Sequence, residues 1–259
     1  MQSVDGMVDD VVRSAARFTA SAAALTDTGL RAPSGLARWT RAHVLAHLAG
    51  SADAYVRLLR SARADHRAPR RPADAAALAH AVEEDAARPA TELVGRLNDS
   101  LERFVHEART MSTEAWDGMV TALTGWRHPA WYTLRRCLRE LETHHVDLDV
   151  GYRTADWPAG YVTWALTETL AALKAQGFPL ARVRATDLGR TWDVDGDGPA
   201  VAAPGHVLLG WFSGRAPADG LASDHQLTAL PTPPTWPQPA VPGWGHDRSR
   251  SWPPVVSAS

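Results

Sequence analysis

The sequence is poor in cysteine and contains no long hydrophobic run. Cys137 is the only cysteine among 259 residues, which excludes an internal disulfide and any zinc site built from several thiolates. We interpret Cys137 as a small buried side chain and not as a reactive thiol. No segment approaches the roughly 18 consecutive apolar residues of a membrane helix, and residues 1–10 lack the apolar core of a signal peptide. The sequence therefore predicts a cytoplasmic protein without a membrane partner.

Lysine is almost absent, since Lys174 is the only lysine among 27 basic residues. Abundant arginine and alanine are typical of a GC-rich genome, such as that of an actinobacterium. A formal net charge of −2 gives no reason to expect nucleic acid as a partner. The chain also lacks a glycine-rich phosphate loop and a serine nucleophile elbow. These absences exclude the common phosphate-loop and serine-hydrolase templates.

Apolar residues recur at helical spacing along most of the first 150 positions. The pattern predicts helices over residues 7–26, 40–64, 73–87, 89–111 and 129–150, with a turn at 112–116 and an extended segment at 118–127. Thr40 is a suitable N-cap for the second of these helices. Antiparallel helices of such lengths predict an up-and-down helical bundle.

The pattern changes after Gly151 and Tyr152. A helix is expected over 161–176, strands over 181–187, 191–194 and 201–203, and another helix over 205–213. Residues from Pro231 onward carry eight prolines and three tryptophans with little periodicity, which is typical of an extended tail. We therefore predict a helical bundle over 1–152, a small α+β domain over 153–230 and a proline- and tryptophan-containing tail over 231–259.

Two predicted helices carry side chains that suit a divalent metal. His47 lies on the helix over 40–64, and Glu140 and His144 lie one turn apart on the helix over 129–150. Two imidazoles and one carboxylate form a common catalytic ligand set, because three protein ligands leave a fourth position open for water or substrate. His43, one turn before His47, is an alternative ligand.

Glu142 and His145 form a second acid–histidine pair on the same predicted helix. They face away from Glu140 in helical projection, so the two pairs cannot point at one metal. His145 and Asp147 could support the site by hydrogen bonds to its ligands, or could simply cap the end of the helix.

Three segments together carry a family resemblance: residues 39–48 (WTRAHVLAHL), 139–148 (RELETHHVDL) and 209–220 (LGWFSGRAPADG). They resemble the mycothiol-dependent maleylpyruvate isomerase family, within the DinB-like superfamily of metal-binding four-helix bundles. The resemblance implies a divalent metal, usually zinc, on His47, Glu140 and His144, and a supporting or capping role for His43. It also implies that Arg215 reaches towards the mouth of the active site, where it binds an anionic substrate or the thiol. The tail after about residue 230 has no counterpart in this pattern.

The resemblance further implies an enzyme in which a metal-bound thiolate attacks an electrophilic small molecule. The thiol cosubstrate would be mycothiol, and the reaction would be cis–trans isomerisation of the maleylpyruvate type or thiol S-transfer. The alternative is a non-catalytic metal-binding bundle with a stress or structural role, although a structural metal prefers four closed ligands. Both a monomer and a homodimer are compatible with the sequence.

Overall fold

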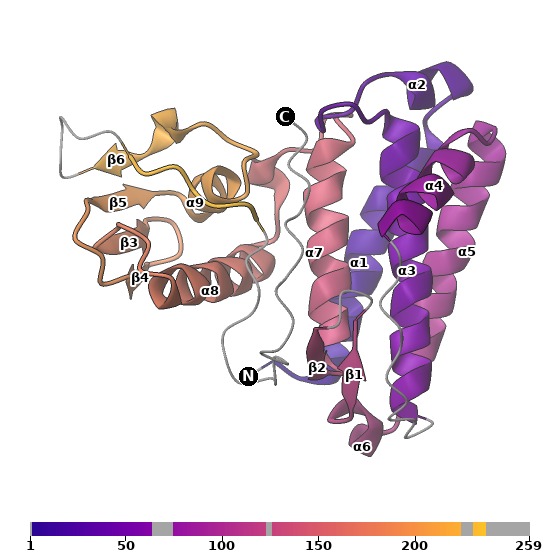
Figure 1. Ribbon diagram of the computed structural model, residues 1–259, viewed down its shortest axis with the longest axis horizontal. Coiled ribbons are helices and arrows are strands. Elements are labelled where there is room, and N and C mark those ends of the chain that lie inside the picture. The colour runs from indigo at the N-terminus through magenta and orange to yellow at the C-terminus, as the bar shows by residue number, and fades with distance from the viewer. Residues whose placement is uncertain (1, 64–74, 123–125, 224–229, 237–259) are drawn as a thin grey trace. The chain divides into compact units, whose positions relative to one another are not determined.

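The computed structural model describes residues 2–63, 75–122, 126–223 and 230–236 (Figure 1). These residues form two compact units, of which the first ends at Gly151 and the second begins at Tyr152. None of the helices in the described residues is long and apolar enough to cross a membrane.

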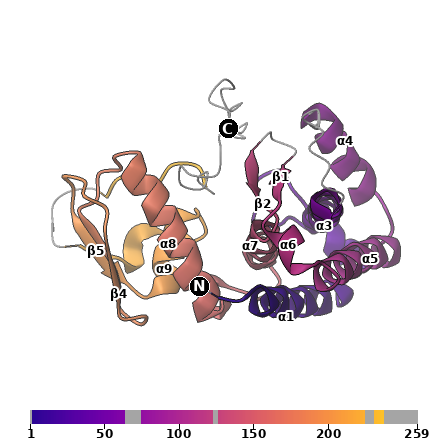
Figure 2. The same cartoon turned by 90° about the horizontal axis from the view of Figure 1, so that it is seen from below.

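The first unit is built on four long helices. They are α1 (Val4–Ala23), α3 (Arg41–Arg63), α5 (Ala90–Arg109) and α7 (Tyr132–Asp147). Seen end-on in Figure 2, α1 and α3 each pack against both α5 and α7. The fully buried side chains between them are mostly leucine and phenylalanine: Phe18, Leu45, Leu59, Leu93, Leu97, Phe104, Leu134 and Leu141. The predicted four-helix bundle is therefore confirmed.

Shorter elements join the long helices, among them the predicted helix over 73–87 and part of the extended segment predicted over 118–127. They are α2 (Asp27–Arg31), α4 (Ala75–Ala86), α6 (Thr113–Trp116), β1 (Met119–Thr121) and β2 (Arg127–Pro129). The predicted end of the first helix at residue 26 is wrong, because the Thr26 side chain accepts the Gly29 amide and caps α2 instead. Strands β1 and β2 pair antiparallel, with Val120 opposite His128.

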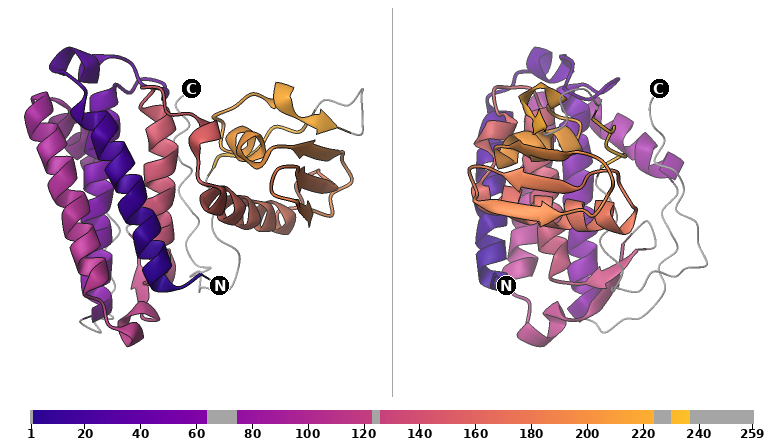
Figure 3. Two further views of the ribbon diagram at one scale, coloured as in Figure 1. Left: turned by 180° about the vertical axis from the view of Figure 1, so that it is seen from behind. Right: turned by 90° about the vertical axis from the view of Figure 1, so that its left-hand side faces the viewer.

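The second unit is a small α+β fold, as predicted. Its elements are η1 (Thr154–Asp156), α8 (Ala159–Ala175), β3 (Arg182–Ala185), β4 (Arg190–Asp193), β5 (Ala200–Ala203), α9 (Gly205–Phe212), η2 (Ala218–Gly220) and β6 (Ala222–Ser223). The sheet order is β4-β3-β5-β6, and only the β3–β5 pair is parallel. Helix α9 packs against β3 and β5 (Figure 3). Val183 and Ala185 of β3 are buried, whereas Arg182 and Arg184 alternate with them and are exposed on the other face.

The predicted tail is described only as far as residue 236. Trp236 lies against the second unit, where its indole Nε1 donates a hydrogen bond to Thr169 Oγ1 at 3.0 Å. The rest of the predicted tail, 237–259, lies outside the described residues.

Candidate metal centre

Helices α3 and α7 bring His47, Glu140 and His144 together. One carboxylate oxygen of Glu140, Oε2, lies 2.8 Å from His47 Nε2 and 3.3 Å from His144 Nε2. The three donor atoms all lie within 4.8 Å of one another. The side chains are 31%, 27% and 15% exposed for His47, Glu140 and His144, so a small molecule can reach the group from solvent.

A fourth side chain orients this group. Asp147 Oδ2 lies 2.9 Å from His144 Nδ1, and a carboxylate can only accept, so Nδ1 carries the proton there. In the neutral ring this leaves the lone pair of Nε2 directed at Glu140. A carboxylate behind a ligating histidine is the usual arrangement in metal centres. Of the two residues that could support the site, Asp147 therefore contacts a member of the group.

The charges of the group fit a divalent cation. Burial acts against the charge on His144, but hydrogen bonds with Asp147 and Glu140 outweigh it and raise the pKa of His144 to about 9. Burial likewise acts against the charge on Glu140, but hydrogen bonds from His144 and His47 hold its pKa well below the ordinary range. The Glu140 carboxylate is thus anionic, and it favours the protonated form of His144. A cation that displaces protons from the histidines would satisfy the same donors.

Trp39 lies next to the group of three. The sequence did not single out this residue. Its ring centroid lies 5.4 Å from that of His47 and 6.2 Å from that of His43. Arg38, directly before it, has a φ of 67°, in the left-handed region that side chains other than glycine seldom adopt. Such backbone is often retained where it places a side chain at a functional site.

His43 lies outside the group of three. Its Nδ1 accepts a hydrogen bond from the Thr40 amide at 3.1 Å, and its Nε2 lies 3.0 Å from Glu83 Oε2 on α4. These contacts belong to the first turn of α3 and to the neighbouring helix. They agree with the capping role that the resemblance implies and give no support to His43 as a ligand.

The second acid–histidine pair of α7 points at α1. Arg17 Nη2 donates a hydrogen bond to Glu142 Oε1 at 2.6 Å, and Ser21 Oγ lies 2.9 Å from His145 Nε2. Glu142 is 0% and His145 3% exposed. His145 thus contacts Ser21 and Phe18 on the opposite helix.

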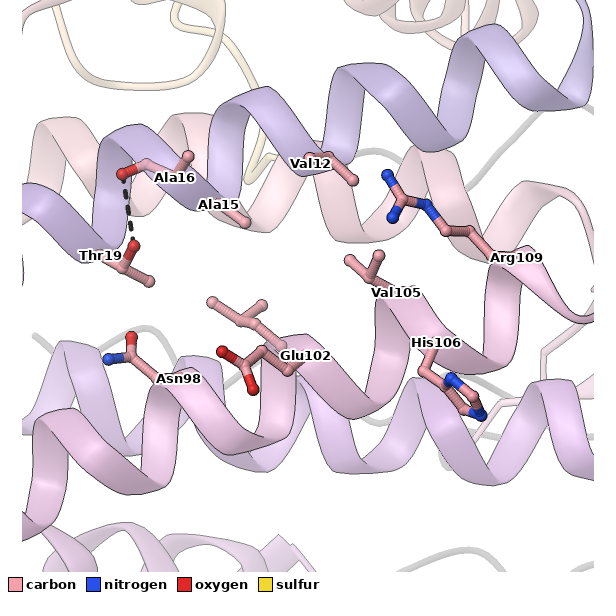
Figure 4. Close-up of a pocket in the computed structure, with 10 residues that line it drawn as sticks. Val12, Ala15, Ala16, Thr19, Asn98, Glu102, Val105, His106 and Arg109 are labelled. Atoms are coloured by element: carbon pink, nitrogen blue, oxygen red, sulfur yellow. Dashed lines mark hydrogen bonds between the residues drawn. The ribbon is translucent and has the colours of Figure 1, made fainter.

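A further pair with the same spacing shows that spacing alone does not make a site. A cavity of about 500 Å³ lies between α1 and α5. Figure 4 shows Glu102 and His106 beside it, one turn apart on α5, with Thr19 on the facing helix. In the part of the chain that the structure describes, His47, Glu140 and His144 are the only three such side chains that converge as a metal would require.

Arg215 belongs to the second unit and follows α9. Its Nη1 donates to the carbonyl oxygen of Ser213 at 2.8 Å, and its guanidinium carbon lies 5.8 Å from the centroid of the Trp236 ring. Gly214, with a φ of 72°, makes the turn that separates Arg215 from the helix axis. Its role in binding an anion stays a prediction.

The bundle with its convergent histidine–glutamate–histidine group defines a helical-bundle protein with a candidate metal centre. Residues 11–149, more than half of the chain, match the family model described as the mycothiol maleylpyruvate isomerase N-terminal domain. The chain belongs to this family, as the three sequence segments predicted.

Two solved structures are similar to the chain. A crystal structure of a mycothiol-dependent maleylpyruvate isomerase has a TM-score of 0.79 and 22% sequence identity, and the match covers 91% of this chain and 98% of that one. A variant of such an isomerase with histidine replaced by alanine gives a TM-score of 0.78 and 21% identity over the same shares. At these identities the likeness establishes the fold. Among curated protein sequences, none matches the chain.

Proposed function

We propose that the protein is a metal- and mycothiol-dependent enzyme that isomerises a cis double bond of the maleylpyruvate type, or transfers the thiol to an electrophile. The observation that carries the proposal is the convergence of His47, Glu140 and His144 on one point, with Asp147 behind His144. Family membership and the likeness to solved isomerases support the choice of thiol and reaction class.

The side chains of His47, Glu140 and His144 would hold the metal. Zinc is the metal to use in the test, because its usual catalytic ligands are histidine and carboxylate. A bound cation would lower the pKa of a thiol at the site, and the thiolate would add to the double bond and leave again after rotation to the trans isomer. His47 and His144 would contribute neutral nitrogen donors, and Glu140 would contribute the negative charge that partly balances the cation. Asp147 keeps the proton of His144 on Nδ1, so that Nε2 stays available as a donor.

Arg215 is the second part of the proposal, which rests on the family resemblance. Its guanidinium would bind an acidic group of the substrate or of the thiol through two parallel hydrogen bonds, which lysine cannot reproduce. Losing that contact should cost on the order of 2 kcal/mol, or roughly thirty-fold in kcat/KM. We therefore expect Arg215→Lys to be nearly as damaging as Arg215→Ala, with unchanged metal content. Wild-type kcat/KM in both variants would show that Arg215 does not bind the substrate or the thiol.

The decisive experiment is calorimetric titration of mycothiol into zinc-loaded and zinc-free protein, paired with a spectroscopic assay of maleylpyruvate isomerisation. We expect thiol binding and turnover to require both zinc and His47, so His47→Ala should lose both. His106→Ala is the matched control, because His106 is exposed on α5 and far in sequence from the candidate ligands. Thiol binding that is independent of zinc would instead favour a non-catalytic bundle.

A further inference from the structure

Arg136 lies on α7 one turn before Glu140 and two turns before His144, on the same side of the helix. Its guanidinium carbon is 5.1 Å from the centroid of the Tyr55 ring. Tyr55 in turn lies on α3, two turns after His47. Burial raises the pKa of the Tyr55 hydroxyl well above its ordinary value; Glu140 raises it further, and Arg136 lowers it. Tyr55 therefore lies within electrostatic range of both Arg136 and the metal centre.

A buried histidine holds the guanidinium in place. His128 on β2 is 0% exposed, and its Nδ1 lies 2.9 Å from the carbonyl oxygen of Pro129. Arg136 Nη1 lies 3.1 Å from His128 Nε2. A carbonyl can only accept and a guanidinium can only donate, so the proton of the neutral ring is on Nδ1 and Nε2 is the acceptor. His128 thus fixes Arg136 without neutralising it.

Two aromatic rings lie next to the guanidinium. Besides Tyr55 at 5.1 Å, the Trp126 ring has its centroid 5.8 Å from the guanidinium carbon of Arg136. A cation over an aromatic face is stabilised by the ring. These contacts use none of the five N–H donors of the guanidinium. Only the bond to His128 uses one of these donors among the described residues.

The charge of Arg136 has no carboxylate counterpart in the described part of the chain. Elsewhere in the bundle, two arginines of one helix share a carboxylate of the neighbouring helix. Arg60 and Arg63 both pair with Glu107, and Arg96 and Arg103 both pair with Asp53. A half-buried cation without an anion is costly for folding alone, whereas a fixed, planar fork of donors suits a carboxylate ligand.

We propose that Arg136 binds a carboxylate of the substrate beside the metal centre and so determines that the enzyme selects anionic electrophiles. The assignment of that anion as the substrate rests on the proposed function, but the anion site itself does not. Arg136 and Glu140 are four positions apart, a rise of about 6 Å along the helix. That distance allows one short organic acid to contact Arg136 with its carboxylate and present its reactive carbon to the metal centre.

The test is calorimetric titration of maleate into zinc-loaded protein, with dimethyl maleate as the neutral probe of the same shape. We expect Arg136→Met to weaken maleate binding about 10- to 100-fold, as for the loss of a charge-assisted contact. Arg136→Lys should recover part of the affinity, since it keeps the charge but not the fork. Dimethyl maleate should bind weakly to all proteins. Arg136→Gln, which keeps a donor for His128, replaces the methionine variant if that variant does not fold.

Arg135→Met is the matched control, because Arg135 is the neighbouring arginine of α7 and its Nη2 donates to Gln2 Oε1 at 3.0 Å. Its maleate affinity should equal that of the wild type. Equal maleate binding by wild type and by the folded Arg136→Met or Arg136→Gln protein would overturn the assignment. Zinc content and mycothiol binding are measured in the same samples. If the wild type shows no metal-dependent thiol binding, the proposed function is refuted, whereas the anion site is still supported by the maleate titrations.

Discussion

Helix α7 carries two acid–histidine pairs that use the same residue types in different surroundings. Glu142 is fully buried against a guanidinium from α1, whereas Glu140 is partly exposed and has two imidazoles as its partners. The guanidinium of Arg17 cannot lose its proton near neutral pH, so no metal can take its place. Imidazoles can release theirs to a metal. The identity of the balancing cation, and not the presence of an acid and a histidine, thus separates a structural pair from a candidate metal centre.

The largest expected effect is on metal content, when substitutions of the candidate ligands are compared with a substitution in the second acid–histidine pair. We expect His47→Ala, Glu140→Gln and His144→Ala each to abolish stoichiometric zinc binding, because a two-ligand remnant leaves the metal mostly to water. His145→Ala should keep zinc at wild-type level, since His145 Nε2 contacts Ser21 Oγ on α1. Elemental analysis after dialysis gives the metal content of each variant. Full zinc occupancy in His144→Ala would break the comparison.

The reverse pattern should hold for stability. We expect Glu142→Gln to lower the free energy of unfolding by about 1.5–3 kcal/mol, as for the loss of a hydrogen bond between charged groups. Its zinc content should not change, because Glu142 contacts Arg17 and not the candidate ligands. Urea unfolding of zinc-free protein measures the difference. A zinc-deficient but stable Glu142→Gln protein would mean that the two faces of α7 have been assigned the wrong way round.

The sequence predicted the bundle and the three candidate ligands because both follow from periodicity and from spacing along single helices. It left the two pairs of α7 open until a family resemblance chose between them. Their partners, Arg17 and His47, lie on α1 and α3, and no local pattern shows which helix a given face of α7 meets. Trp39 and Arg136 were missed because their contacts join different elements: Trp39 lies before α3 and contacts His47 on it, and Arg136 on α7 contacts His128 on β2 and Tyr55 on α3. The short helix α2 was missed because Thr26 was not recognised as a cap.

Asp147 offers a finer test of what makes His144 a ligand. Asp147→Asn keeps the size of the side chain but removes the charge 2.9 Å from His144 Nδ1. We expect zinc affinity to fall about 10- to 100-fold, the usual effect of such supporting groups. Competition with a chromophoric chelator measures the affinity. Asp149→Asn serves as control, since that side chain is 73% exposed; an equal loss in both variants would point to general charge and not to orientation of His144.

His128 sharpens the comparison as a buried histidine that forms hydrogen bonds with a carbonyl and a guanidinium. Burial, and then the charge of Arg136, lower its pKa from 6.5 to about 3. The unfolded chain therefore takes up a proton below pH 6.5 that the folded chain refuses until about pH 3, so the stability contributed by neutral His128 is lost as the pH falls. At pH 5 the loss should be about 2 kcal/mol.

We expect His128→Gln to lose about 2 kcal/mol less stability than wild type when the pH falls from 7 to 5. Urea unfolding at both pH values measures this double difference, in which titrations common to both proteins cancel. Equal losses in the two proteins would show that His128 is already charged in the folded state. In that case Arg136 would have no neutral acceptor beside it.

The smallest expected effect concerns Cys137, which lies three residues before Glu140 on α7 and is 2% exposed. Burial, and then the charge of Glu140, raise the pKa of its thiol above the ordinary value, so the nucleophilic thiolate is scarce at neutral pH. We expect Cys137→Ala to keep mycothiol-dependent turnover within about twofold of wild type, because a buried protonated thiol contributes no nucleophile. A disulfide reagent should modify wild-type protein only after unfolding. Rapid modification of the folded protein, together with an inactive but zinc-loaded Cys137→Ala variant, would make this residue the reacting thiol and remove the need for an exogenous one.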